Sequence, residues 1–507
     1  MKKFTNVFII SVIISFLFII WGVLAPDHIA RVMTSIQAFL QDKFGWFYLF
    51  STTGFLALCF FLIFSRYGKI RLGKDTDRPE FSNITWFAML FSAGMGIGLV
   101  FWGTAEPLSH LHNPIFGEAG SPEAANVAMR YTFFHWGLHP WGIYSLLALA
   151  LAYFNFRKGA PGLISYTFYP LLKEKVKGPL GKTIDIIAVY ATVIGVATSL
   201  GMGAIQISGG LSFVTPLENN FITQFVIIVT VTILFILSAT SGLNKGIKYL
   251  SNLNILLAIL LMLFVLLTGP TKFIMNLFTT TLGSYIQELP QMSFYLGPFN
   301  RQANNWIQDW TIFYWAWWIA WAPFVGTFIA RISRGRTIRE FVIGVLLVPT
   351  VFGAFWFSVL GGTGLHMDMS MNIPLFEVMS NRGTETALFS MLSQLPLSII
   401  MIMLAVFLIS SFFITSADSA TFVLGMQSTN GSLNPPNSIK WIWGVIISSF
   451  AAILLYSGGL EGLQMASVIV AFPFAFILIG IAFSLIEAFR KEMPKSRKAM
   501  AAEPEAN

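Results

Sequence analysis

The residues most suggestive of chemistry are five tryptophans close together in the sequence DWTIFYWAWWIAWAPFVGTF. They are Trp310, Trp315, Trp317, Trp318 and Trp321, a third of the 15 tryptophans in the chain. A belt of aromatic residues at a membrane surface accounts for only one or two of them. The face of an aromatic ring attracts a cation without a counter-charge, by about 2 kcal/mol per contact when water is excluded. This cluster therefore indicates a binding site for a quaternary ammonium group.

A second group of aromatic residues surrounds Pro140 in the sequence HWGLHPWGIYS. Trp136 lies near the expected outer end of a helix, where a role as an interfacial belt residue is the alternative to a binding role. Trp141 and Tyr144 are three residues apart, so they share one helix face further into the membrane. These two residues are candidates for the same kind of site.

Three glycines alternate with other residues in the sequence FSAGMGIGLVFWGTAEP, at Gly94, Gly96 and Gly98. Each weakens a helix by about 1 kcal/mol relative to alanine. A helix broken in the membrane is tolerated where the freed backbone groups are buried or line a cavity, and there they can bind ions or a carboxylate. The alternative is close helix packing, because Gly94 and Gly98 also have the small-xxx-small spacing.

Hydroxyl groups interrupt a later apolar stretch in the sequence FFITSADSATF. Thr415, Ser416 and Ser419 surround Asp418. Hydroxyls and freed carbonyls are hard oxygen ligands that can bind Na+. The alternative is hydrogen bonding between or within helices. Asp418 is a candidate for a structural or gating charge.

Other kinds of chemistry lack their motifs. The sequence has no GxxxxGK[ST], no HExxH and no convincing Ser/His/Asp set. Cys59 is the only cysteine, which excludes a disulfide framework and a cysteine-based metal cluster. We therefore expect no enzyme, no ATP-driven pump and no organic cofactor. The histidines show no metal-ligand spacing along the sequence, and they are His28, His110, His112, His135, His139 and His366.

The composition is that of a membrane protein. Hydrophobic residues make up 55% of the 507 residues and charged residues 11%, against about 25% charged residues in soluble domains. The mean hydropathy is +0.72. These values exclude a soluble enzyme, a disordered regulator and a nucleic-acid-binding domain.

Twelve predicted transmembrane helices position these residues, since each needs about 20 predominantly apolar residues. The first follows Lys2 and Lys3 and has no small-residue cleavage site, so we expect a retained span rather than a signal peptide. The predicted spans are residues 8–26, 45–65, 84–104, 131–155, 182–210, 222–241, 250–269, 306–332, 339–362, 388–417, 440–458 and 463–489.

The 31 lysines and arginines are unevenly distributed between the loops. With the N-terminus inside, most of them fall in cytoplasmic segments such as 66–78, 157–182 and 490–498. This is the positive-inside pattern, and it predicts that both termini are cytoplasmic. The net charge of +8 therefore reflects topology, and nucleic acid is not an expected partner.

Together these motifs make the sequence resemble the betaine/choline/carnitine transporter family. The strongest match is DWTIFYWAWW at 309–318, which is similar to the tryptophan-rich signature of that family. The other matching segments follow in the order of the family, and they are GMGIG at 94–98, HWG…HPW…Y at 135–144, ARISRGRTIREF at 330–341 and TSADS at 415–419.

The resemblance implies a fold: an all-α polytopic membrane protein with a LeuT-like core of two inverted five-helix repeats. The glycine-rich third span and the tryptophan-rich eighth span would then hold corresponding positions, where such transporters bind substrate. Family members commonly form homotrimers. The expected divisions are 1–83 (a short cytoplasmic N-terminus and two peripheral helices), 84–271 (first repeat), 272–305 (outer interfacial helix and loop), 306–489 (second repeat) and 490–507 (short basic cytoplasmic tail).

The same resemblance implies residue roles at the substrate site. Phe313 and Trp315 would lie on the pathway. The cage around the substrate would be formed by Trp136, Trp141, Tyr144, Trp317, Trp318 and Trp321. The backbone near the substrate would belong to Gly94, Met95, Gly96 and Gly98.

Sodium is the coupling ion that the resemblance implies. Gly98 stands where proton-coupled relatives tend to carry aspartate. The first sodium site would use carbonyls of Ala93, Met95 and Phe412 with hydroxyls of Thr415 and Ser416.

A second sodium site is expected at Thr192 and Phe324. Well-studied sodium-coupled relatives carry two threonines four residues apart at this place. Here the second of them is replaced by Val196, whose methyl groups cannot ligate a cation.

These expectations converge on a secondary transporter in the cell membrane that carries a quaternary ammonium osmolyte inward with Na+, with glycine betaine as the first choice. The alternatives are proton-coupled or exchange transport of choline, carnitine, ectoine or another betaine, and an uncoupled channel. The expected partners are the zwitterionic substrate and membrane lipid.

Overall fold

The computed structural model describes residues 4–94, 96–240 and 244–492, and this part of the chain is helical, without a strand. The all-α prediction is therefore confirmed. The α-helices are α1 (Asn6–Leu24), α2 (Pro26–Phe64), α3 (Asn83–Gly94), α4 (Ile97–His112), α5 (Pro122–Trp136), α6 (Leu138–Ala152), α7 (Tyr169–Leu172), α8 (Pro179–Val214), α9 (Phe221–Thr240), α10 (Asn244–Thr268), α11 (Thr271–Phe294), α12 (Arg301–Ile307), α13 (Phe313–Arg331), α14 (Ile338–Ser370), α15 (Leu375–Arg382), α16 (Ala387–Leu392), α17 (Ser398–Ser428) and α18 (Asn437–Glu492). Tighter or wider turns form η1 (Arg66–Lys69), η2 (Tyr153–Arg157), η3 (Ser165–Phe168), η4 (Lys173–Lys177), η5 (Gln308–Ile312) and η6 (Thr384–Thr386).

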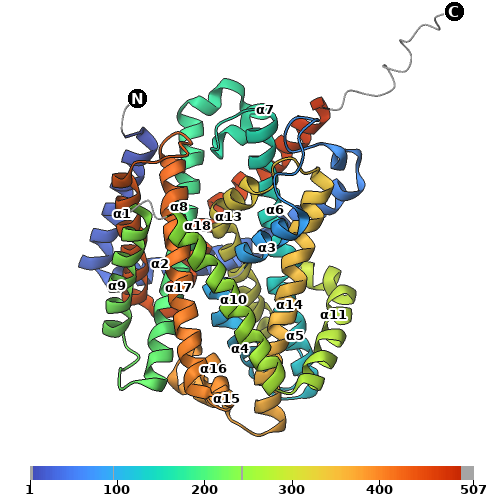
Figure 1. The fold of residues 1–507 in the computed structure, drawn as a ribbon, viewed down its shortest axis with the longest axis vertical. Coiled ribbons are helices and arrows are strands. Elements are labelled where there is room, and N and C mark those ends of the chain that lie inside the picture. Colours follow the sequence, from blue (N-terminus) through green and yellow to red (C-terminus); the bar gives the residue numbers. More distant parts are fainter. Residues whose placement is uncertain (1–3, 95, 241–243, 493–507) are drawn as a thin grey trace, which may run out of the picture.

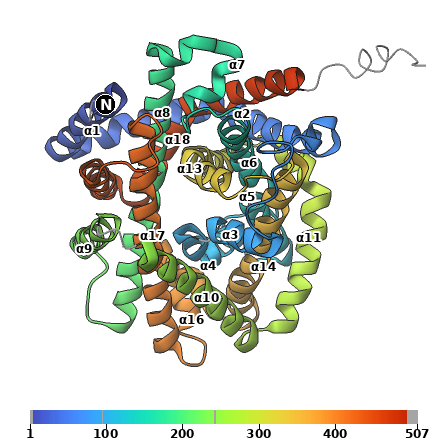
Figure 2. The ribbon, with the colours of Figure 1, turned by 45° about the horizontal axis from the view of Figure 1, so that its top comes forward.

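The long helices run side by side in one bundle (Figure 1). Helix α13 packs against α6, α8 and α18. Helices α1 and α9 lie on one flank of the bundle, and α11 lies on the opposite flank (Figure 2). The start of α1, the short helix α7 and the end of α18 lie at one end of the bundle, opposite α15 and α16 (Figure 1).

Ten helices in the described part of the chain are long and apolar enough to cross a membrane. In the apolar stretch of Pro122–Arg157, 94% of that stretch is buried inside the protein, against 22% for Phe221–Ala239. The less buried helix α9 exposes large apolar side chains such as Ile222 and Ile233. Such a surface suits contact with lipid, so the chain is a polytopic membrane protein.

The ten helices relate to the twelve predicted spans in two informative ways. Helix α18 contains both of the last two predicted spans, which meet at Gly459 with a φ of 57°. The predicted third span is divided between α3 and α4, each too short to be counted alone. The interruption that the glycines predict is thus present, because α3 ends at Gly94 and α4 begins at Ile97.

Some predicted boundaries are wrong. The second span was expected at 45–65, but α2 begins at Pro26, because proline suits the first turn of a helix. The tenth was expected to begin at 388, but α17 begins at Ser398, after Pro396 and the left-handed residue Leu397. The proline lacks the N–H that a continuous helix needs.

Candidate functional site

The tryptophans of α13 face the protein interior. Trp315 and Trp317 are almost fully buried, and Trp318 is 7% exposed. A wider helical turn, η5, immediately precedes α13, and such turns are frequent at functional sites. Burial of these rings excludes a simple membrane belt.

The second aromatic group is divided by a break between α5 and α6. Trp136 ends α5, and Gly137 has a φ of −96° and a ψ of −130°. A Cβ atom on Gly137 would lie 2.5 Å from the Phe133 carbonyl oxygen and 2.7 Å from Tyr285 Oη. Only glycine fits there without a shift, so the HWG sequence fixes the place where Trp136 leaves the helix.

The six aromatic residues expected around the substrate form one continuous cluster, which we call the aromatic cluster. Trp318 lies at its centre. Its ring centroid is 4.7 Å from that of Trp317, 4.8 Å from that of Trp136 and 6.2 Å from that of Tyr144. Trp141 contacts Tyr144 at 5.4 Å, and Trp321 contacts Trp317 at 6.5 Å. Trp136 therefore packs inside the protein and is not a belt residue.

Hydrogen bonds orient three of these indole rings. Trp136 Nε1 donates to Glu106 Oε2 at 2.7 Å, and Trp318 Nε1 donates to the His135 carbonyl at 2.9 Å. Trp321 Nε1 donates to the Gly195 carbonyl at 2.5 Å. These rings are held by polar contacts as well as by packing.

The glycine-rich segment lies beside the aromatic cluster. A Cβ atom on Gly98 would lie 2.6 Å from Trp317 Cη2 and 3.1 Å from Trp136 Cη2. On Gly96 it would meet no atom within 4 Å. Gly98 thus serves close packing, while Gly94 is the last residue of α3. Met95 lies outside the described residues.

The two expected pathway residues lie on different sides of α13. Phe313 stacks on Trp317 with ring centroids 5.8 Å apart. Trp315 instead stacks on His139 at 5.0 Å and contacts Phe134. Only Phe313 therefore contacts the aromatic cluster through one of these ring pairs.

A cavity of about 720 Å³ adjoins the aromatic cluster. Trp321 and Phe324 lie in its wall, together with Phe412, Thr415 and Ser416 of α17. It extends along α13 and α17 to charged residues that include Arg331, Asp418 and Lys440. The last residue of α17 contacts the residue that precedes α1, since Thr5 Oγ1 donates to the Ser428 carbonyl at 2.6 Å.

Of the two hydroxyls expected to bind sodium, that of Thr415 forms hydrogen bonds within the protein. Thr415 Oγ1 donates to the Ser411 carbonyl at 2.9 Å and accepts from Asn254 Nδ2 at 3.3 Å. Ser416 is half-buried in the cavity wall. Ala93 lies in the last turn of α3.

Of the two residues of the second expected sodium site, Phe324 lies in the cavity wall and Thr192 is fully buried. The Thr192 hydroxyl donates to the Ala188 carbonyl at 2.9 Å and to Gln427 Oε1 at 3.2 Å. Val196 is buried one helical turn further along α8.

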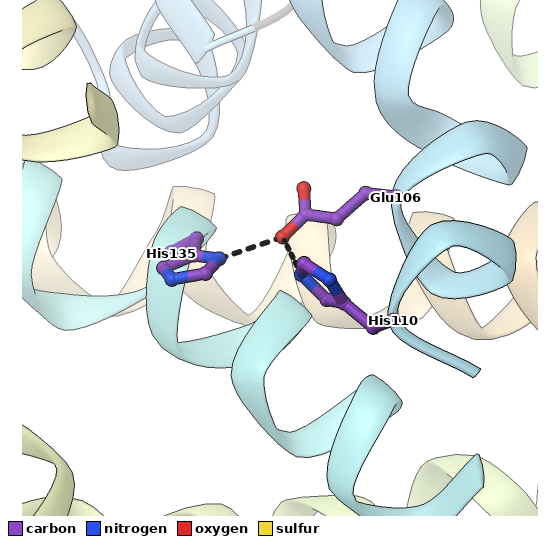
Figure 3. A group of neighbouring side chains, drawn as sticks. All are labelled: Glu106, His110 and His135. Atoms are coloured by element: carbon purple, nitrogen blue, oxygen red, sulfur yellow. Dashed lines mark hydrogen bonds and ion pairs between the residues drawn. The ribbon is translucent and has the colours of Figure 1, made fainter. Parts of the chain in front are cut away.

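Sequence reasoning missed Glu106, a fully buried residue of α4. Its Oε2 accepts from Trp136 Nε1 and, at 2.5 Å, from Tyr314 Oη. Its Oε1 lies 2.7 Å from His135 Nδ1 and 3.2 Å from His110 Nε2, as Figure 3 shows. The available signal was an acidic residue directly beside an apolar span, which is costly unless it is paired.

Comparison with known proteins identifies the family. The profile described as "BCCT, betaine/carnitine/choline family transporter" matches residues 6–494. The chain belongs to the betaine/carnitine/choline transporter family. It is 55% identical to the glycine betaine transporter OpuD of Bacillus subtilis, over 98% of this chain and 97% of that protein.

Two further relatives show the range of names within this family. The chain is 44% identical to a probable glycine betaine transporter of Desulfitobacterium hafniense, over 97% of this chain and 99% of the relative. It is 43% identical to an ectoine/hydroxyectoine transporter of Virgibacillus pantothenticus, over 97% of each protein. The family resemblance drawn from the motifs is therefore confirmed.

In this betaine/carnitine/choline transporter, one group of described side chains has the composition of a metal site. Glu106, His110 and His135 each offer one ligand atom, and these atoms lie within 4.8 Å of one another. The linear spacing of the histidines concealed this grouping, because His135 comes from another helix. Hydrogen bonds within the group and to Trp136 and Tyr314 already satisfy the carboxylate, so the arrangement needs no ion.

Proposed function

We propose that the protein imports glycine betaine together with Na+ as a secondary symporter. The observation that carries the proposal is the aromatic cluster of six side chains around Trp318. Rings gathered at one place can surround a trimethylammonium group, which carries charge but donates no hydrogen bonds. The Bacillus relative named as a glycine betaine transporter supports the same substrate.

Two polar atoms in the aromatic cluster suit the other end of the zwitterion. Trp317 Nε1 and Tyr144 Oη are buried without a hydrogen-bond partner in the part of the chain that the structure describes. A buried donor without an acceptor costs about 1–3 kcal/mol. A substrate carboxylate would relieve that cost, and freed backbone N–H groups near Gly96 would add donors.

Sodium coupling is supported by the position of the α17 hydroxyls. Thr415 and Ser416 share the cavity wall with Trp321, so an ion bound to them would lie next to the aromatic cluster. Carbonyls of Ala93, Met95 and Phe412 complete the proposed site. Thr192 and Phe324 form the proposed second site, which lacks a threonine at Val196.

The proposed architecture is a twelve-span LeuT-like fold, with the division into two inverted repeats at 84–271 and 306–489. The broken pair α3/α4 and the kink at Gly459 support this count, because they account for the two spans beyond the ten. We place both termini in the cytoplasm on the distribution of lysine and arginine. A homotrimer is the proposed assembly.

The substrate proposal predicts selectivity for methylated ammonium groups. Glycine betaine should displace radiolabelled glycine betaine from the purified protein, and glycine at a hundredfold excess should not. A primary ammonium loses hydration that ring faces cannot replace. Ectoine is the second candidate, because of the Virgibacillus relative, and the same competition assay includes it. Displacement by glycine would contradict the quaternary ammonium site.

A further inference from the structure

Glu106 connects three helices at the edge of the aromatic cluster. It belongs to α4, His135 and Trp136 belong to α5, and Tyr314 belongs to α13. Its two carboxylate oxygens each meet two partners, so all four contacts converge on one buried group. Hydrogen bonds to an ionised acceptor are stronger than neutral ones.

The contacts of Glu106 reach the central ring of the cluster by two routes. Trp136 is bound directly and packs on Trp318 with ring centroids 4.8 Å apart. The side chain of His135 bonds Glu106, and the backbone carbonyl of His135 accepts a hydrogen bond from the indole N–H of Trp318 at 2.9 Å. The His135 ring also lies 4.7 Å from Tyr314, nearly parallel to it.

Trp136 needs such a contact more than a residue inside a helix would. It is the last residue of α5, and the chain changes direction at Gly137. Neighbouring turns of one helix therefore do not enclose the Trp136 ring on both sides. The hydrogen bond from Trp136 Nε1 to the Glu106 carboxylate orients the ring, which α5 alone does not do.

We infer that Glu106 is a positioning residue that sets the shape of the substrate site by fixing the rings of Trp136 and, through His135, Trp318. The inference rests on the proposed function, since it assigns a role within the same site. Glu106 acts through these rings, and its effect is on substrate affinity and on selection among ammonium groups.

Two substitutions separate positioning from simple loss of charge. In Glu106→Gln the amide oxygen can still accept from Trp136 and Tyr314, while the amide N–H groups donate to histidine nitrogens in their other tautomer. Glu106→Leu has a similar size but accepts nothing. A positioning role therefore predicts a mild effect for glutamine and a strong effect for leucine, whereas a role for charge alone predicts equal effects.

The test measures binding of radiolabelled glycine betaine to the purified full-length variants. We expect the Kd to rise about tenfold in Glu106→Leu and about threefold or less in Glu106→Gln, because one buried donor left unpaired weakens binding by that order. Glu385→Leu is the matched control, since Glu385 is also a buried glutamate but bonds Asn219, and its Kd should stay at the parent value.

A second readout needs no substrate. Near-ultraviolet circular dichroism reports the environment of aromatic rings, so the spectrum of Glu106→Leu should differ from that of the parent. That change should shrink in a Trp136→Phe background, where the indole N–H is absent.

The outcomes distinguish the two proposals. Parent-like affinity and an unchanged spectrum in Glu106→Leu would overturn the positioning role, as would equal Kd values for the leucine and glutamine variants. If Glu106→Leu does not reach the membrane, Glu106→Gln decides: a Kd within about threefold of the parent value supports the role, and a rise of about tenfold or more would overturn it in favour of charge alone. A parent that binds no glycine betaine would instead overturn the proposed function, and the spectra would then decide the role of Glu106.

Discussion

Replacing Trp318 with alanine is expected to weaken glycine betaine binding about thirtyfold, the cost of one desolvated cation–π contact. Trp318 is the ring that contacts Trp136, Tyr144 and Trp317, so its loss opens the centre of the aromatic cluster. Trp321→Ala should act in the same direction. Trp318→Phe should retain part of the affinity, because it keeps a ring face but loses the bond to the His135 carbonyl.

Equilibrium binding of radiolabelled glycine betaine measures this effect. Trp443→Ala is the matched control, because Trp443 is also fully buried but packs on Phe8 and donates to Ser428. It should lower the yield of folded protein while leaving the Kd unchanged. Parent-like binding by both Trp318→Ala and Trp321→Ala would show that these rings only pack the core.

Removing the hydroxyls of Thr415 and Ser416 together should raise the half-saturating Na+ concentration for uptake about tenfold or more. Both residues lie in the cavity wall beside Trp321, where an ion would bias the conformation that binds substrate. Binding is reciprocal, so saturating glycine betaine should tighten sodium binding in the parent and less so in the double variant.

Sodium titrations of uptake test this prediction. The control is Ser410→Ala with Thr421→Ala, two hydroxyls of the same helix that bond only to backbone carbonyls in the described structure. Val196→Thr restores the second threonine on the face of Thr192, and it should steepen the sodium dependence. An unchanged titration in the Thr415/Ser416 double variant would remove these residues from the sodium site.

Local patterns in the sequence predicted part of the fold and part of the candidate site. The tryptophan-rich helix and the HWG…HPW segment each have an unusual composition, and the structure brings all six of the expected rings together. The glycine pattern indicated either a broken helix or close packing, and the described residues show both: α3 ends at Gly94 and α4 begins at Ile97, while Gly98 packs closely against Trp317. A short segment of unusual composition can therefore indicate a binding site or a helix break before the fold is known.

Contacts between distant segments were not accessible. Glu106 meets Tyr314 across 208 positions of the sequence, and no local pattern pairs them. The hydroxyl of Thr192, which belongs to the proposed second sodium site, bonds Gln427 of α17, 235 positions away in the sequence. Hydropathy predicted two spans within α18, but the non-helical backbone of Gly459 that lies between them is a feature that hydropathy does not show.

The central claim is sodium-driven import of glycine betaine, and uptake into proteoliposomes tests it most directly. Radiolabelled glycine betaine is supplied outside, and inward gradients of Na+, H+ or K+ are imposed in turn. We predict accumulation above the external concentration with the Na+ gradient alone. Equal accumulation driven by a proton gradient without sodium, or entry that stops at the external concentration under every gradient, would contradict the account.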